Sequence, residues 1–341
     1  MIKKILLVLV SVVVFVSCSN NTTSPDSSNN GNNSGVTPPT VDKEEEELIK
    51  KYGIDISQDD AVISQKIEEN LKAYFTEKNS YRVILTGTPK DYTQDVNESL
   101  YTLVLKAAVK VNTTMNIELD IKNINFKDGS VKTGMFSGNI IDNSENIVIT
   151  FAFPTDKIKT IEMRSFDSLS NTKEIIMPDS VITISESAFY FSTSIEKLIL
   201  GKNVQTIGDQ AFLYVQALKE LIIPDSVKSI GVGAFSGSFI EVLKLSSSLV
   251  SIGDSAFDSS NIKELTIPAS VTSIGSMAFA FSQQLTTLTY LGTNPNNINH
   301  KGDVFVECTK LKTLIIPNAE NDKDTKWGSF LGGTFTDIRK Q

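Results

Sequence analysis

The chain has 341 residues, a formal net charge of −8 and a hydrophobic fraction of 40%. That fraction is enough for a sizeable core, and the acidic balance without a basic stripe argues against a nucleic-acid partner. The single histidine, His300, excludes a histidine-rich metal cluster and leaves one imidazole for a catalytic triad. Because His300 lies in an Asn- and Gly-rich stretch, we interpret it as a solvated loop residue. We expect neither a bound metal nor a cofactor.

The N-terminus has the features of an export signal. Two lysines precede an apolar segment, residues 5–15, which is too short to cross a membrane. The Ser-Cys pair that follows resembles a bacterial lipobox, although Phe15 stands where leucine is commoner. The resemblance implies cleavage before Cys18 and lipidation of its thiol, with simple secretion as the alternative. We therefore predict a lipoprotein signal peptide over 1–18. Residues 19–41, rich in Ser, Asn, Thr, Gly and Pro, are predicted to be a disordered tether.

Residues 42–150 show no fixed repeat, and their apolar residues follow helical or alternating spacing. Residues 148–153 resemble a degenerate first rung of the repeat that follows. We expect this region to be an N-terminal α/β cap, with a separate functional domain as the competing interpretation. The spacing predicts helices over 44–51, 61–77 and 95–110, and strands over 81–86 and 115–121.

The second half of the chain repeats itself at a fixed period. An apolar residue, an isoleucine three positions later and a small-Phe pair recur every 22 or 23 residues, and the pattern apolar-x-x-apolar-x-apolar follows each. One copy has too little apolar surface to fold alone, so the copies should stack as rungs, with one short strand each. In four copies a glycine follows the column isoleucine, and these residues, Gly208, Gly231, Gly253 and Gly275, are expected to serve a tight turn. The phenylalanines are Phe166, Phe189, Phe212, Phe235, Phe257 and Phe279.

The segment from Ile223 to Phe235, IPDSVKSIGVGAF, carries a family resemblance. It is similar to the BspA-like leucine-rich-repeat family of bacterial surface proteins, and the similarity covers about residues 154–341. It implies an α/β leucine-rich-repeat solenoid, right-handed and with a parallel sheet, over residues 151–341. Trp327 is expected to lie in a short C-terminal cap over the last rung. Members of this family are implied to bind host proteins or other cells, and catalysis is not associated with the repeat.

Two further features of the second half are candidate sites. Residues 318–324 alternate acidic side chains but lack the glycine and the distal glutamate of a calcium-binding EF-hand, which favours a solvated loop. Cys308 occupies a position where the family often has a buried cysteine, so we interpret it as a small core residue.

Side chains between the core positions of each strand should point outward and form ladders along the sheet. Three consecutive isoleucines beside alternating charges indicate a recognition patch. The alternative is that β-branched residues simply suit exposed strands. One ladder reads Ile176, Ile199, Ile222, Lys244, Thr266 and Thr289, and the neighbouring ladder includes Glu174, Lys197, Glu220 and Glu264.

These features favour a lipid-anchored protein of the bacterial cell envelope, facing outward from the outer membrane or cell surface. We expect it to bind a protein or glycan ligand of a host or another cell. The alternative is a periplasm-facing structural or assembly lipoprotein that binds an envelope partner. A hydrolase within residues 42–150 is a third hypothesis, but no paired-carboxylate or nucleophile motif supports it, so we predict a non-enzymatic protein.

Overall fold

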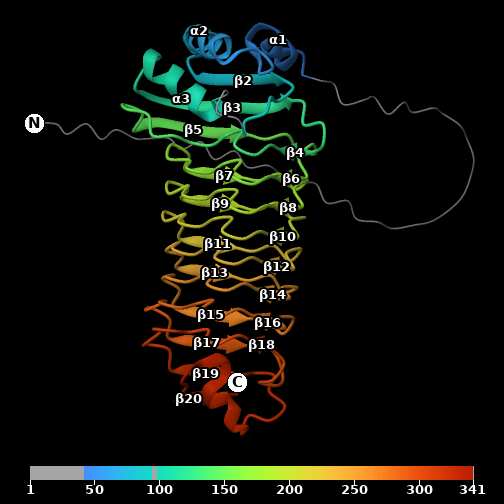
Figure 1. The fold of residues 1–341 in the computed structure, drawn as a ribbon, viewed down its shortest axis with the longest axis vertical. Coiled ribbons are helices and arrows are strands. Elements are labelled where there is room, and N and C mark those ends of the chain that lie inside the picture. Colours follow the sequence, from blue (N-terminus) through green and yellow to red (C-terminus); the bar gives the residue numbers. More distant parts are fainter. Residues whose placement is uncertain (1–41, 94–97, 341) are drawn as a thin grey trace, which may run out of the picture. The chain divides into compact units, whose positions relative to one another are not determined.

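The computed structural model describes residues 42–93 and 98–340, and a compact unit begins at Glu44. The predicted signal peptide 1–18, with Cys18, and the predicted tether 19–41 lie outside the described residues. Within the part of the chain that is described, no helix is both long enough and apolar enough to span a membrane. Figure 1 shows the order of the elements.

The unit begins with a parallel α/β sheet. Its strand order is β1-β2-β3-β5, and every neighbouring pair is parallel, which requires crossover connections such as those that α2 and α3 provide. The helices and strands predicted here are confirmed within a few residues, except for one helix start (below). The elements are α1 (Lys43–Tyr52), β1 (Gly53–Asp55), α2 (Asp60–Lys78), β2 (Tyr81–Gly87), α3 (Leu100–Val111), β3 (Thr114–Ile124) and β5 (Asn146–Ala152).

Helix α3 begins later than its apolar spacing predicts. The apolar spacing predicts a helix start at residue 95, whereas the helix starts at Leu100. Ser99 has extended backbone, and its hydroxyl accepts a hydrogen bond from the Thr102 amide at 3.1 Å. A serine in that position satisfies one of the free amides of the first turn, so it sets the start of the helix.

The repeat region has two faces, not one. The long-strand face, predicted from the leucine pattern, consists of parallel strands of three or four residues whose central side chains are inward. Strand β5, predicted as a degenerate first rung, pairs with β3 and contacts β7, so it joins the cap sheet to this face. The strands are β7 (Glu174–Ile176), β9 (Lys197–Ile199), β11 (Glu220–Ile222), β13 (Val242–Lys244), β15 (Glu264–Ile267), β17 (Thr287–Tyr290), β19 (Thr313–Ile315) and β20 (Asp337–Arg339).

The short-strand face was not predicted, because the expectation was one strand per rung. Two residues of each rung form a second parallel sheet of eight strands. Strands this short carry no alternating pattern that a sequence reading could detect. They are β4 (Ser130–Val131), β6 (Thr160–Ile161), β8 (Thr183–Ile184), β10 (Thr206–Ile207), β12 (Ser229–Ile230), β14 (Ser251–Ile252), β16 (Ser273–Ile274) and β18 (Asn299–His300).

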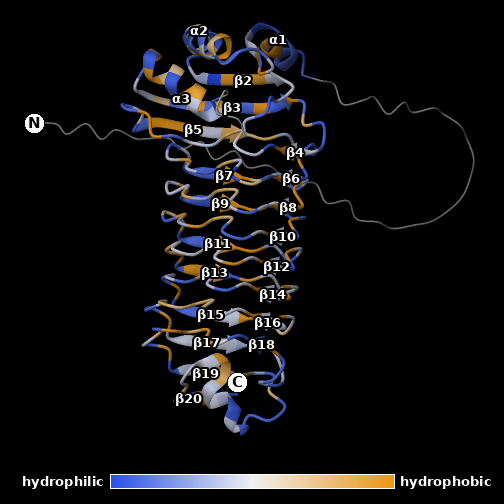
Figure 2. Cartoon of the chain, viewed as in Figure 1, coloured by the Kyte–Doolittle hydropathy of each residue, from blue (hydrophilic) through white to orange (hydrophobic). Residues whose placement is uncertain are grey.

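A column of stacked phenylalanines runs between the faces. From Phe166 to Phe279 successive rings are 5.0–5.3 Å apart with interplanar angles of 4–8°. The column extends one rung further at each end than the fixed period indicated, to Phe136 and Phe305. Figure 2 shows apolar and polar segments alternating around the rungs, as expected of a coil with an apolar interior. Each ring therefore depends on the rungs directly before and after it.

The column glycines have a different role from the one expected. Gly231 and Gly253 are outside the left-handed region, so a tight turn does not require them. Instead a Cβ on Gly253 would lie 2.5 Å from the backbone of Gly231 and Val232 in the preceding rung. The missing side chain allows consecutive rungs to approach closely.

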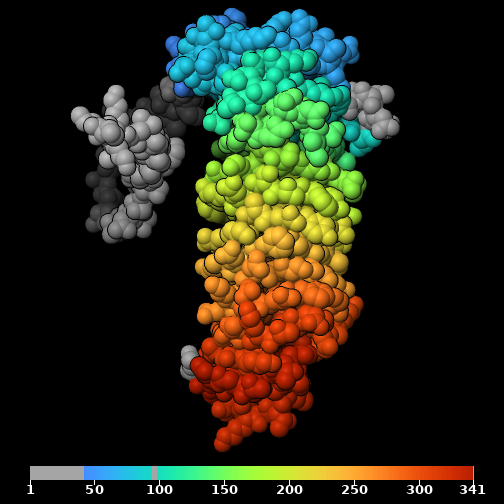
Figure 3. All heavy atoms as spheres, turned by 90° about the vertical axis from the view of Figure 1, so that its left-hand side faces the viewer, coloured from blue at the N-terminus to red at the C-terminus, as the bar shows by residue number. Residues whose placement is uncertain are grey.

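Both ends of the stack are closed. At the N-terminal end the Tyr101 hydroxyl of α3 accepts a hydrogen bond from the backbone N–H of Asn171 at 3.1 Å. The side-chain amide of Asn171 donates hydrogen bonds to the backbone carbonyls of Ser144 and Ile147. At the C-terminal end a 3-10 segment, η1 (Thr325–Gly332), buries Trp327 against Tyr290 of β17. The space-filling view shows the rungs following one another in chain order between these ends (Figure 3).

Candidate functional site

The predicted isoleucine ladder is exposed on the long-strand face. Ile176 lies opposite Ile199 in the register of β7 and β9, and Ile222 occupies the same position in β11. These three side chains are 53%, 44% and 53% exposed, although isoleucine is among the residues most often buried. The same ladder continues with Lys244 and then with Thr266 beside Thr289.

The neighbouring ladder carries charges that are paired between rungs. Glu174 lies opposite Lys197 and forms an ion pair with it. One position before these strands begin, the Lys173 ammonium is 3.0 Å from the Glu196 carboxylate. Such exposed pairs contribute little to stability, about 0–1 kcal/mol each. Because the two charges of each pair offset each other, they leave little net charge for a partner to recognise. The exposed isoleucines are therefore the feature that distinguishes this face.

In β13 the charged ladder contains an apolar residue, and the isoleucine ladder contains a charged one. Val242 stands opposite Glu220 in the charged ladder, and Lys244 stands opposite Ile222. Val242 is 57% exposed and lies diagonal to Ile222, within reach of a shared ligand. The exposed apolar surface therefore covers four consecutive rungs, with a diagonal step at its end. Glu264 and Thr266 of β15 mark the polar surface beyond it.

A hollow adjoins the cap-side end of the isoleucine ladder. It has a volume of about 360 Å³ and is lined by Phe151 and Phe153 from the end of β5 together with Ile176, Met177 and Pro178. The lining is mainly apolar, and one of its walls is the first exposed isoleucine. It could not be predicted from the sequence, because the hollow depends on how β5 packs beside β7.

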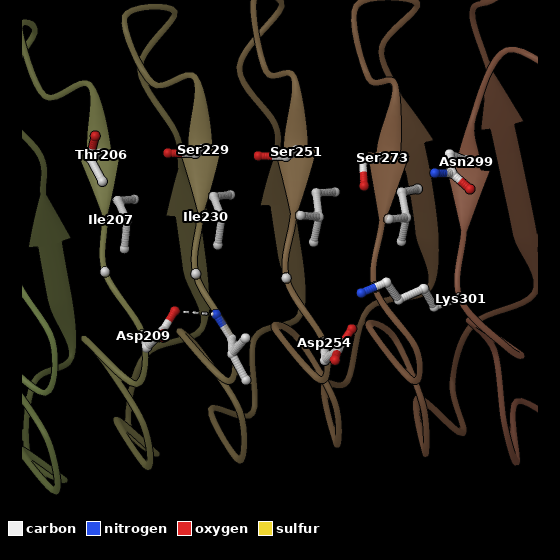
Figure 4. A pocket seen from close by; sticks show the side chains of 17 residues that line it. Thr206, Ile207, Asp209, Ser229, Ile230, Ser251, Asp254, Ser273, Asn299 and Lys301 are labelled. Carbon is white, nitrogen blue, oxygen red and sulfur yellow. Dashed lines mark hydrogen bonds between the residues drawn. The ribbon is translucent and has the colours of Figure 1, made fainter.

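The short-strand face contains a larger groove of about 460 Å³ (Figure 4). Its lining includes the small hydroxyl residues that precede the column isoleucines in β10 to β16, and Lys301 lies at one end. A Ser or Thr precedes each of these isoleucines in the sequence, and this pattern could have indicated a hydroxyl-lined surface. Such a surface was not predicted. The hydroxyl residues are Thr206, Ser229, Ser251 and Ser273.

The two carboxylates at the groove wall are already engaged by the backbone. Asp209 accepts a hydrogen bond from the Val232 amide at 2.8 Å, and Asp254 accepts one from the Ser276 amide at 2.9 Å. Each bond joins one rung to the next, as Figure 4 shows for Asp209. These acids therefore have a structural role in holding neighbouring rungs together.

Comparison with known families agrees with this geometry. The model of the BspA type leucine-rich repeat region matches in six copies, over residues 118–219, 142–249 and 205–325, which together cover more than half of the chain. The chain belongs to the BspA-type leucine-rich repeat family. The match begins ahead of residue 151, in agreement with Val131 of β4 and Phe136, which occupy the repeat columns one rung earlier than the sequence period indicated.

Solved structures similar to this BspA-type chain include other bacterial leucine-rich repeat proteins. A protein from Bacteroides ovatus is 21% identical with a TM-score of 0.46, and the match covers 66% of this chain and 60% of that one. A Treponema pallidum leucine-rich repeat protein is 24% identical, with coverage of 59% and 79% and a TM-score of 0.37. The pneumococcal vaccine antigen PcpA is 19% identical, with coverage of 76% and 73% and a TM-score of 0.39. No curated protein matches the sequence.

Other residues singled out in the sequence have structural surroundings. Cys308 is buried and free, and its thiol donates to the Phe279 carbonyl at 3.1 Å. Burial raises the pKa of Cys308 to about 11, so the thiol stays protonated at neutral pH. His300 is exposed as predicted, but it belongs to the short strand β18 and not to a loop.

The acidic run at residues 318–324 is placed at the C-terminal cap. Asp324 caps η1 by accepting a hydrogen bond from the Lys326 amide, and Asn318 donates to the Leu291 carbonyl. Among the residues described by the structure, no group of three or more His, Cys, Asp or Glu side chains is arranged to hold a metal ion.

Proposed function

We propose that this BspA-type protein is a lipid-anchored cell-surface protein whose long-strand face binds a macromolecule of a host or of another cell. The observation that carries the binding proposal is the in-register ladder Ile176, Ile199 and Ile222, extended diagonally by Val242. Leucine-rich repeat proteins generally bind protein ligands, and stacked repeats offer an extended surface for this purpose. A protein partner is therefore the ligand that we favour for this face.

The energetics of the ladder suit a contact surface. Complete burial of an isoleucine side chain contributes about 1.5–3 kcal/mol, so covering the exposed half of each contributes on the order of 1 kcal/mol. The ion pair between Glu174 and Lys197 lies beside the ladder and can remain solvated at the rim of an interface. We infer that a partner covers the isoleucines and leaves the charges at its edge.

The hollow beside Ile176 can receive an apolar side chain of that partner. Phe151, Phe153 and Pro178 supply walls of the kind that receive an anchor residue at an interface. A contact of this kind requires no catalytic group, and the repeat fold is typical of non-enzymatic binding scaffolds. We propose that the protein is not an enzyme.

The surface location rests on the sequence of the N-terminus. Residues 1–18 resemble a lipoprotein signal, and the composition of residues 19–41 suits a tether that would hold the folded unit away from the lipid. We propose lipidation at Cys18 and an outward-facing position at the cell surface.

Protease shaving of intact cells tests this location. The cells are treated with protease and blotted for this protein, with a periplasmic protein as the control for envelope integrity. Loss of the signal with the control intact supports a surface protein. Complete protection contradicts surface binding and favours the alternative, a periplasm-facing structural or assembly lipoprotein.

A further inference from the structure

A second exposed surface lies at the corner that follows the phenylalanine column. Two residues after each column phenylalanine from Phe166 to Phe305, the backbone enters the left-handed region, with φ between 55° and 65°. Left-handed backbone favours glycine, and a bulky side chain there is uncommon. The residues at this position, in rung order, are Ser168, Phe191, Tyr214, Gly237, Ser259, Phe281 and Glu307.

Three of these positions carry aromatic rings that are not buried. Phe191, Tyr214 and Phe281 are 43%, 38% and 41% exposed. The backbone strain at these sites is therefore not offset by placing the rings in the core. Strained backbone that is retained at an exposed position is characteristic of functional surfaces.

The rings at two of these positions form a continuous aromatic strip with their neighbours. The centroids of Phe191 and Tyr214 are 4.8 Å apart, and the ring of Tyr190 lies 4.7 Å from that of Phe191. The Tyr214 ring continues onto the next rung, where a Cβ on Gly237 would come within 2.5 Å of it. At the other end the Arg164 guanidinium lies 5.7 Å from the Tyr190 centroid. We call Tyr190, Phe191 and Tyr214 the aromatic strip.

Arg164 is a charged group at the Tyr190 end of the strip, whereas the residues that flank the rings in the sequence are uncharged. Residues 190–194 read Tyr-Phe-Ser-Thr-Ser and residues 213–217 read Leu-Tyr-Val-Gln-Ala. Gln216 is exposed and Ser194 is partly exposed, which leaves both available as hydrogen-bonding groups. Exposed aromatic faces attract C–H groups through their negative π surface, and uncharged donors and acceptors match hydroxyl groups.

We propose that the aromatic strip is a binding site for a neutral glycan, separate from the long-strand face. The apolar C–H face of a sugar ring stacks on Phe191 and Tyr214, while Gln216 and Ser194 bond its hydroxyl groups. A protein partner is less suited to this corner, because a protein hot spot occupies a desolvated pocket. Neither the hollow beside Ile176 nor the groove of the short-strand face is lined by the strip.

Native gel electrophoresis of the full-length protein in gels that contain polysaccharide tests the proposal. The probes are hydroxyethylcellulose, yeast mannan and galactan as neutral chains, with hyaluronan as an acidic one. We expect slower migration in at least one neutral gel than in an empty gel, unaffected by salt. No retardation by any neutral probe, or retardation by hyaluronan alone, would overturn the proposal.

Glycine substitutions separate binding from folding at this corner. Phe191→Gly with Tyr214→Gly removes both rings and fits the left-handed backbone, so the Tm should not fall while retardation is lost. Phe191→Asn with Tyr214→Asn provides a second pair, because asparagine also tolerates this backbone. Ser259→Gly, at the same turn position without a ring, is the matched control and should keep retardation.

Two outcomes of these variants contradict a glycan site on the strip. In the first, both double variants are still retarded as strongly as the wild type. In the second, they lose retardation together with several degrees of Tm, which assigns the rings a structural role. Ile199→Asp on the long-strand face should leave retardation unchanged, and its loss there would place the glycan on the other surface.

Discussion

The repeat region and the α/β cap are stabilised in different ways. In the repeats each phenylalanine has the same environment as the next, stacked 5.0 Å from its neighbours on both sides at Phe189 and Phe212. The cap has no such equivalence, and it relies on individual contacts such as the pair between Arg82 and the fully buried Asp120. The effect of a mutation should therefore be similar at equivalent positions of different rungs, whereas each position of the cap should respond in its own way.

The junction between the two regions combines both kinds of contact. Hydrophobic side chains pack without interruption from Ile54 of the cap to Phe335 near the C-terminus, so the two regions share one core. The polar connection at the junction is more local and depends on Asn171 and Tyr101. Mutations in the apolar core and at the junction should therefore have different effects.

Truncation of a column phenylalanine should have the largest effect. We expect Phe212→Ala and Phe235→Ala to lower the free energy of unfolding by about 3–5 kcal/mol each, since both leave a cavity between two stacked rings. Phe305→Ala should cost less, because its ring is 6.0 Å from Phe279 and tilted by 22°. Urea denaturation followed by circular dichroism measures all three. Clearly unequal losses at Phe212 and Phe235 would contradict the equivalence of the rungs.

Loss of the Asn171 side chain should uncouple the cap from the repeats. Asn171→Leu leaves the carbonyls of Ser144 and Ile147 buried without their donor, at a cost of about 1–3 kcal/mol for each. We expect an early unfolding transition for the cap, visible as faster amide exchange in α3. Asn203→Leu, at an exposed asparagine with one bond to the Asp179 carbonyl, is the matched control. A single transition at the wild-type midpoint would show that the packed core alone couples the two regions.

The ion pair of α1 should make cap stability sensitive to acid. The hydrogen bond from Arg82 holds the pKa of Glu45 below its usual value of 4.5. A carboxyl with a lowered folded pKa stabilises the protein above its unfolded pKa, and this stability disappears as the pH falls through the folded pKa. Glu45→Gln should therefore cost at most about 1 kcal/mol at pH 7. The difference from the wild type should vanish well below pH 4.5.

The measurement is the free energy of unfolding of the cap against pH, followed by amide exchange in α1. Glu46→Gln, at an exposed position on the same helix, is the control and should show no such dependence. A cost of Glu45→Gln that stays constant down to pH 3 would rule out the ion pair as its cause.

Relief of backbone strain in a rung should have the smallest effect, and a favourable one. Ser259 has a φ of 61°, so Ser259→Gly should raise the free energy of unfolding by up to about 1 kcal/mol. The increase should appear as a higher Tm in a thermal scan. A lower Tm would indicate that the serine side chain contributes more than the strain costs.

The same difference between regions explains what could be predicted from the sequence. The period revealed the rungs because every copy repeats the same buried positions. It missed the rung of Phe136, which precedes Phe166 by 30 residues, since an insertion breaks the spacing. The start of α3 depended on the Ser99 cap, a single local contact that apolar spacing does not contain.

The candidate surfaces were predictable to different degrees. Strand alternation alone placed Ile176, Ile199 and Ile222 outward, and the structure exposes them. The hollow at Phe151 and Phe153 could not be predicted, because it requires two segments that meet only in the folded unit. The aromatic strip was also missed, since left-handed backbone at a non-glycine residue leaves no mark in the sequence.

Binding by variants of the long-strand face shows whether this face holds the partner. Purified wild type, Ile199→Asp, Ile222→Asp and Thr266→Asp would be compared for binding to epithelial cells by flow cytometry. We expect at least tenfold weaker binding for both isoleucine variants and wild-type binding for Thr266→Asp, with equal Tm values for all four. Equal binding by all four proteins would contradict the claim that this face holds the partner.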